Sequence, residues 1–267
     1  MQRRDLLKGF VLGGAASELG RVAMASAAPL PAGGAARLAA VERRYGGRLG
    51  VAILDTGSGE RFLMCSTFKL LLVSAMLASA DRGEEKLSRR IVYHKDAVLE
   101  WAPVTRKHVG PPGMTIAQLC LAAITLSDNT AANLLLEQVG GPPAVTRYAR
   151  GLGDTFTRLD RIEPALNWRE GDKDTTTPDA TLADMRKLLL GDALSRRSRG
   201  RLIHWLLACR TGADALRAGL PPDWQEGDKT GSGRTANNDI AILRPPLRKP
   251  LLVTAYYEKA HADVPAR

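Results

Sequence analysis

The chain has 267 residues, of which 45% are hydrophobic and 25% are charged, and its formal net charge is +10. This composition is that of an ordinary globular protein, and the length is sufficient for one or two domains. Aromatic residues make up only 5% of the chain, and no Lys/Arg run is interleaved with them. The basic balance permits nucleic acid but is explained as well by an anionic small substrate, and without such a run we expect no nucleic acid as a partner.

The first 28 residues have the pattern of an export signal. Two arginines, Arg3 and Arg4, precede a Leu-Leu-Lys segment and a weakly apolar Gly/Ala-rich run, and Ala23-Met24-Ala25 matches a signal cleavage site. This pattern predicts a twin-arginine signal over residues 1–28. We therefore expect a periplasmic protein with no membrane contact after signal removal, since no stretch is long and apolar enough to span a bilayer.

Periodicity predicts a helical middle between two β-rich ends. The expected strands are 48–55, 239–243 and 251–257, and the expected helices are 35–45, 66–81, 115–125, 130–138, 142–150, 177–190 and 198–210. This order predicts an α/β fold with an all-α part: an antiparallel sheet built from both chain ends, flanked by helices, with an inserted helical domain. We assign the α/β domain to 29–62 and 211–267, and the helical domain to 63–210.

The cysteines and histidines give no metal-binding pattern. Cys65, Cys120 and Cys209 form no CxxC pair, and the four histidines lack ligand spacing. We therefore expect no metal and no cofactor.

One stretch, Ser66-Thr67-Phe68-Lys69, carries nucleophile chemistry. Positions three apart share a helix face, so Lys69 would hold its amine beside the hydroxyl of Ser66 at the start of a helix. A serine hydroxyl needs a neighbouring base, and a desolvated lysine can act as one. A Ser-x-x-Lys pair also arises by chance, so this motif indicates a catalytic site only in combination with further motifs.

Three further motifs follow, each with a structural alternative. Ser127-Asp128-Asn129 provides a hydroxyl and an amide, but these residue types also favour helix N-caps. A Glu and an Asn four apart, Glu163 and Asn167, would activate one water, although a loop glutamate usually faces solvent. Lys229-Thr230-Gly231-Ser232-Gly233 combines anion-binding side chains with glycines that let a ligand approach a strand, or forms a β-turn with a solvated lysine.

In this order the four motifs resemble those of the class A serine β-lactamases over essentially residues 35–267. The resemblance implies hydrolysis of penicillin- or cephalosporin-type antibiotics through an acyl-enzyme, giving antibiotic resistance, in a monomer with its active site between the two domains. It implies that Ser66 is the nucleophile, that Lys69, Ser127 and Glu163 transfer protons, and that an oxyanion hole forms from the backbone N–H groups of Ser66 and Ser232. Substrate contacts are implied for Trp101, Asn129, Asn167, Lys229, Thr230 and Ser232. The Ω loop is implied at 161–174, closed by an Arg161–Asp174 ion pair.

The sequence also departs from the family pattern. By comparison with that pattern, we expect the strand after 48–55 and the C-terminal helix to be missing and the Ω loop to be short. Gly233 stands where some members place a cysteine paired with position 65, so we expect no such disulfide. A D-Ala-D-Ala carboxypeptidase or transpeptidase, or a β-lactam sensor without turnover, would share the acylation residues. The deacylating Glu163 favours the hydrolase over both alternatives.

Overall fold

The computed structural model describes residues 48–52 and 59–259. The predicted export signal, the predicted helix 35–45 and the end of the predicted strand 48–55 lie outside the described residues.

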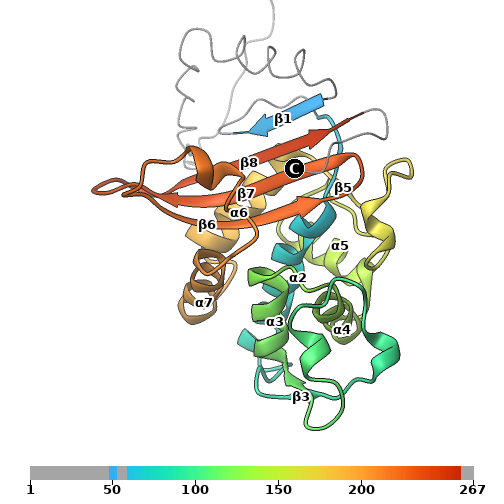
Figure 1. The fold of residues 1–267 in the computed structure, drawn as a ribbon. Helices are drawn as coiled ribbons and strands as arrows, with labels where there is room; N and C mark the ends of the chain where they lie inside the picture. The colour runs from blue at the N-terminus through green and yellow to red at the C-terminus, as the bar shows by residue number, and fades with distance from the viewer. Residues whose placement is uncertain (1–47, 53–58, 260–267) are drawn as a thin grey trace, which may run out of the picture.

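Strands from both chain ends form one antiparallel sheet, as predicted (Figure 1). Its order is β1-β8-β7-β6, with β1 at Arg48–Ala52, β8 at Leu251–Glu258, β7 at Ala236–Arg244 and β6 at Gln225–Ser232. Arg48 pairs with Glu258, and Thr230 pairs with Asp239. Within the described residues β6 is an edge strand, which leaves one of its sides open to neighbouring segments.

Among the described residues, two α-helices pack on this sheet and four lie beyond it. The first pair is α6, Pro178–Met185, against β8 and α7, Arg196–Leu207, against β6. The helical layer contains α2 (Phe68–Asp81), α3 (Ile116–Thr125), α4 (Asn129–Val139) and α5 (Pro142–Gly151). Figure 1 shows α2 between the sheet and the helices α3 and α4. The predicted combination of an antiparallel sheet with a helical part is confirmed.

Short elements connect these layers. The short strand β2 (Phe62–Leu63) pairs with β5 (Thr175–Thr176), and β3 (Arg90–Ile91) pairs with β4 (Met114–Thr115); each of these strands has two residues. Single 3-10 turns occur at η1 (Cys65–Thr67), η2 (Lys95–Ala97), η3 (Thr105–Lys107), η4 (Ala165–Asn167) and η6 (Leu216–Gly219).

Helix α2 is buried on every side, which explains its apolar sequence. Phe68, Leu70, Leu72 and Met76 are all in the core. A helix that is hydrophobic all round belongs in the interior rather than at the surface. Lys69 is carried into the same interior and is fully buried.

Several predicted boundaries were wrong. Residues 177–190 form α6 followed by a π-helical turn, η5 (Arg186–Leu190), rather than one helix. The last helix begins after Ser195 rather than at Ser198, because the Ser195 hydroxyl caps it by accepting a hydrogen bond from the Ser198 N–H (3.2 Å). Strand β6, which contains the Lys-Thr-Gly motif, was not among the predicted strands.

Candidate active site

Ser66 lies in the 3-10 turn η1, two residues before the regular helix α2 rather than inside its first turn. The preceding segment is fixed by the sheet, because Asn238 on β7 donates from Nδ2 to the carbonyls of Leu63 (2.7 Å) and Met64 (3.1 Å). The hydroxyl of Thr67 also donates to the Met64 carbonyl (2.8 Å). The position of the Ser66 hydroxyl is thus set by the sheet and by α2 together.

Lys69 connects the predicted catalytic side chains. Its Nζ donates to Ser66 Oγ (2.8 Å) and Asn129 Oδ1 (2.6 Å), and it lies 2.9 Å from Glu163 Oε1. It also contacts the carbonyl and the hydroxyl of Ser127, at 3.0 and 3.3 Å. Burial lowers the pKa of Lys69, and the carboxylate of Glu163 opposes that shift.

Glu163 is buried and its two carboxylate oxygens have different partners. Oε1 accepts from the Ser66 hydroxyl (3.2 Å), and Oε2 accepts from Asn167 Nδ2 (2.6 Å). A loop glutamate facing solvent, the alternative from the sequence, is therefore wrong here.

Asn133 is a site residue that the sequence analysis missed. Its Nδ2 donates to the Glu163 carbonyl (2.9 Å), and its Oδ1 accepts from the Glu163 backbone N–H (3.0 Å). It lies on α4, four residues after Asn129 and hence on the same helix face. That spacing was the signal available in the sequence.

The Ser127-Asp128-Asn129 turn both caps a helix and supplies side chains to the site, the two alternatives that the sequence left open. Asp128 caps α4 by accepting from the Ala131 N–H (2.9 Å), and it also accepts from the N–H groups of Val104 and Thr105. The buried carboxylate thus makes the turn rigid. Ser127 adopts a positive φ of 55°, and both it and Asn129 face Lys69.

Strand β6 brings the last motif alongside the turn that carries Ser66. Lys229 is buried, and its Nζ donates to the Thr230 carbonyl (2.7 Å). Burial, together with the charge of Lys69, lowers the pKa of Lys229 to about 8. Ser232 is exposed, and its hydroxyl donates to Asn237 Oδ1 (3.3 Å).

The glycines of this motif have a role that the sequence did not reveal. A Cβ on Gly231 would lie 2.6 Å from the Met64 carbonyl oxygen, and one on Gly233 would lie 2.8 Å from that of Asn167. These glycines therefore admit other segments of the same chain, where the sequence suggested only the approach of a ligand. The β-turn alternative is wrong, because the motif lies on a strand.

Trp101 and the Arg161–Asp174 ion pair, which were also predicted, lie at the edge of the group of side chains around Ser66. The Trp101 side chain is 55% exposed, its Nε1 donates to the Leu126 carbonyl, and its own carbonyl accepts from the Asn129 N–H. Arg161 and Asp174 form an ion pair of 2.5 Å. The Asp174 carbonyl accepts from the Met64 N–H (3.0 Å), so the neck of the Ω loop is joined to the segment before Ser66.

The described residues contain no His/Cys/Asp/Glu group suited to a metal ion, and none of their helices has the length and apolar character of a membrane span. Cys65, Cys120 and Cys209 are free and buried.

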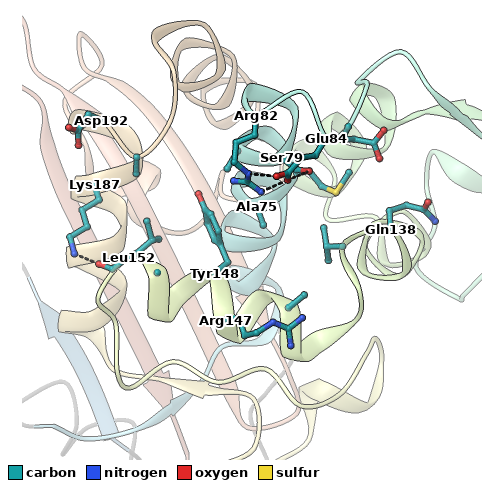
Figure 2. A pocket seen from close by; sticks show the side chains of 17 residues that line it. Ala75, Ser79, Arg82, Glu84, Gln138, Arg147, Tyr148, Leu152, Lys187 and Asp192 are labelled. Carbon is teal, nitrogen blue, oxygen red and sulfur yellow. Dashed lines mark hydrogen bonds and ion pairs between the residues drawn. The ribbon is translucent and has the colours of Figure 1, made fainter.

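A separate cavity of about 850 Å³ lies between α2, α5 and η5 (Figure 2). Arg82 on its wall pairs with Glu84, and Lys187 donates to the Leu152 carbonyl. The residues that line it include none of the predicted site residues, so this cavity is distinct from the constellation around Ser66.

Comparison with known proteins agrees with this geometry. Residues 35–267 match the model of the β-lactamase enzyme family. The chain is 48% identical over 244 residues to a β-lactamase of Streptomyces albus G, covering 85% of this chain and 77% of that protein. It is 47% identical over 232 residues to β-lactamase L2 of Stenotrophomonas maltophilia, covering 82% and 76%. The structure of an ancestral (GNCA) class A β-lactamase matches with a TM-score of 0.81 and 56% identity, covering 85% of this chain and 92% of that one. The chain therefore belongs to the β-lactamase enzyme family, within class A.

Proposed function

We propose that the protein hydrolyses β-lactam antibiotics through an acyl-enzyme on Ser66, and so gives antibiotic resistance. The observation that carries this proposal is the position of Glu163, whose Oε1 lies 3.2 Å from Ser66 Oγ and 2.9 Å from Lys69 Nζ. A hydroxyl held between a carboxylate and a desolvated amine has a base at hand for its proton.

In the acylation step, Ser66 Oγ attacks the lactam carbonyl while its proton passes to Lys69 or, through a water, to Glu163. The backbone N–H groups of Ser66 and Ser232 would stabilise the oxyanion. The Ser127 hydroxyl, 3.3 Å from Lys69 Nζ, would pass a proton to the leaving lactam nitrogen as the C–N bond breaks. Both bases contact Ser66, so the geometry supports either route for the first proton.

The substrate carboxylate would bind Lys229, Thr230 and Ser232 on β6. An anion there gains from the buried ammonium of Lys229, since charge-assisted hydrogen bonds are stronger than neutral ones. Asn129 would contact the substrate amide, and Trp101 would cover the mouth of the cleft.

Deacylation is the step that distinguishes a hydrolase from a cell-wall peptidase or a β-lactam sensor. Glu163 and Asn167 would hold the attacking water between them. Oδ1 of Asn167 is buried and accepts no hydrogen bond from the described residues, which leaves it free to accept one from that water. No cofactor is required for this chemistry.

We further propose that the chain is exported to the periplasm by the signal at 1–28, and that it acts as a monomer without nucleic-acid or membrane partners. The Arg3-Arg4 pair and the cleavage site support export. The side chains that contact Ser66 belong to the same chain, so the site needs no residue from a second copy, which supports a monomer.

The test is turnover of a chromogenic cephalosporin, with mass spectrometry of the protein. We expect many turnovers by the parent chain. Glu163→Ala should acylate and accumulate a one-to-one adduct, because Lys69 remains to take the serine proton whereas the deacylating base is lost. A persistent adduct on the parent chain would instead favour the sensor or peptidase, and parental turnover by Glu163→Ala would refute the assigned base.

A further inference from the structure

A hydrogen-bond chain runs behind Thr230, on the side of β6 facing the end of α7. Thr230 Oγ1 lies 2.6 Å from Thr211 Oγ1, which in turn lies 3.3 Å from the Cys209 sulfur. Neither Cys209 nor Thr211 is part of the motifs that define the site. Together they reach a hydroxyl proposed to bind the substrate carboxylate.

The segment that carries this chain is held tightly against the strand. Gly212 has Asp228 beside it, and a Cβ at Gly212 would lie 2.2 Å from the Asp228 carboxylate. The Arg210 N–H donates to the Thr125 carbonyl (2.9 Å), and Arg217 donates to the Cys209 carbonyl (3.3 Å). The distance between the two threonine hydroxyls is therefore set by backbone contacts on both sides.

The chemistry of the three groups gives the chain a direction. Each hydroxyl has one proton to donate, and a thiol is both a weak donor and a weak acceptor. Burial raises the pKa of the Cys209 thiol, which keeps it protonated. A protonated thiol can donate to Thr211, so the contacts allow the order thiol to Thr211 and Thr211 to Thr230, which leaves the Thr230 proton free. An anion at Thr230 reinforces this order, because hydrogen bonds in series polarise one another.

We propose that Cys209 and Thr211 are positioning residues that orient the Thr230 hydroxyl toward the substrate carboxylate. The inference rests on the proposed binding role of Thr230 and adds two residues that act through it. If the order were reversed, Thr230 would donate to Thr211 and would present only lone pairs to an anion.

The decisive variant is Thr211→Val, which preserves shape and removes the hydroxyl. We expect the dissociation constant of the non-covalent complex, measured by stopped-flow acylation, to rise about five- to tenfold, with the acylation rate constant nearly unchanged. Thr211→Ser should restore parental binding. A β-lactam whose carboxylate is esterified should bind the parent and Thr211→Val equally well, because it presents no anion to Thr230.

Cysteine variants test the other end of the chain. Cys209→Ala should weaken binding of the carboxylate substrate by a smaller factor, about two- to threefold, because Thr211 loses its donor but retains its hydroxyl. The matched control is Cys120→Ala, which removes a buried thiol on α3 that takes no part in the hydrogen-bond chain and should leave binding unchanged. Thermal unfolding of each variant reports whether it folds.

Two outcomes would overturn the inference. One is unchanged binding by Thr211→Val. The other is an equal effect of Thr211→Val in the parent and in a Thr230→Val background, since the effect must pass through Thr230. If Thr230→Val alone leaves binding unchanged, the role of Thr230 and this inference both fail, whereas acylation of Ser66 by the cephalosporin would still support the proposed reaction.

Discussion

Lys229 is a buried cation whose charge depends on pH in the working range. Burial and the neighbouring Lys69 lower its pKa to about 8, so its positive charge is present below that pH and lost above it. The proposed carboxylate anchor should therefore weaken on the alkaline side.

We predict that kcat/KM for carboxylate-bearing β-lactams falls above about pH 8, since this ratio reports ionisations of the free enzyme. Lys229→Arg should remove that alkaline limb while lowering the plateau, because a guanidinium remains charged but has a different shape. The pH–rate profile of the esterified substrate provides the control. The same limb with the ester would assign the ionisation to another group, such as Lys69.

Individual residues also show where prediction from sequence succeeded. Lys69 contacts Ser66, and Asn167 contacts Glu163, because both pairs are close in sequence and a single turn brings them together. Thr211 reaches Thr230 only because α7 ends beside β6. No local pattern predicts that contact, so Thr211 could not be assigned from the sequence.

At the scale of elements, α4 and the Ω loop are joined through the two Asn133 hydrogen bonds to the Glu163 backbone. A base that is displaced by about 1 Å can lose a hundredfold in rate. The role of Asn133 would be to keep Glu163 aligned for deacylation.

We predict that Asn133→Ala slows deacylation by roughly ten- to a hundredfold and acylation much less, since the loop bearing the water-activating base loses its anchor. Single-turnover kinetics and adduct mass spectrometry measure the two steps. Asn133→Asp keeps the acceptor for the Glu163 N–H and should have an intermediate effect. Equal slowing of both steps would instead indicate a general structural defect.

The element boundaries illustrate how tertiary contacts override local signals. Ser195 and Ser198 are both acceptable caps for α7; Ser195 is the cap, its hydroxyl accepting from the Ser198 N–H, and Asp81 at the end of α2 accepts hydrogen bonds from both serines. Likewise, β6 contains two glycines, which disfavour a strand by propensity, yet α7 approaches Gly227 and the segment around Ser66 approaches Gly231 too closely for a Cβ at either position. The sheet architecture was predictable, but these details depend on neighbours distant in sequence.

For the whole molecule, one buried carboxyl group contributes to how stability responds to pH. Asp184 is 2% exposed, and neither of its oxygens accepts a hydrogen bond from the described residues. Burial and the adjacent Asp154 raise its pKa to about 9, while Lys187 and Arg150 oppose the shift. In the unfolded chain the pKa returns to about 4. The folded protein thus retains a proton that the unfolded chain releases, so stability falls as pH rises from about 4 to about 9.

We predict that Asp184→Asn, which stays neutral and keeps the shape, stabilises the fold above pH 7 by on the order of a few kcal/mol. The difference from the parent should shrink as pH falls toward 4. Urea unfolding at pH 5 and pH 8.5 measures both proteins. Stability curves that stay parallel over this range would show that Asp184 is ionised in the folded state.

The hydrogen bonds from Asn238 to the Leu63 and Met64 carbonyls have a consequence for local opening. Asn238 lies on β7, a strand paired on both sides, whereas Lys229 and Thr230 lie on the edge strand β6. Edge strands fray at a lower free energy than central ones. A fluctuation that opens β6 would release the substrate carboxylate while the nucleophile stays fixed to the central sheet. Release of the product would then depend on β6, whereas the position of Ser66 would depend on β7.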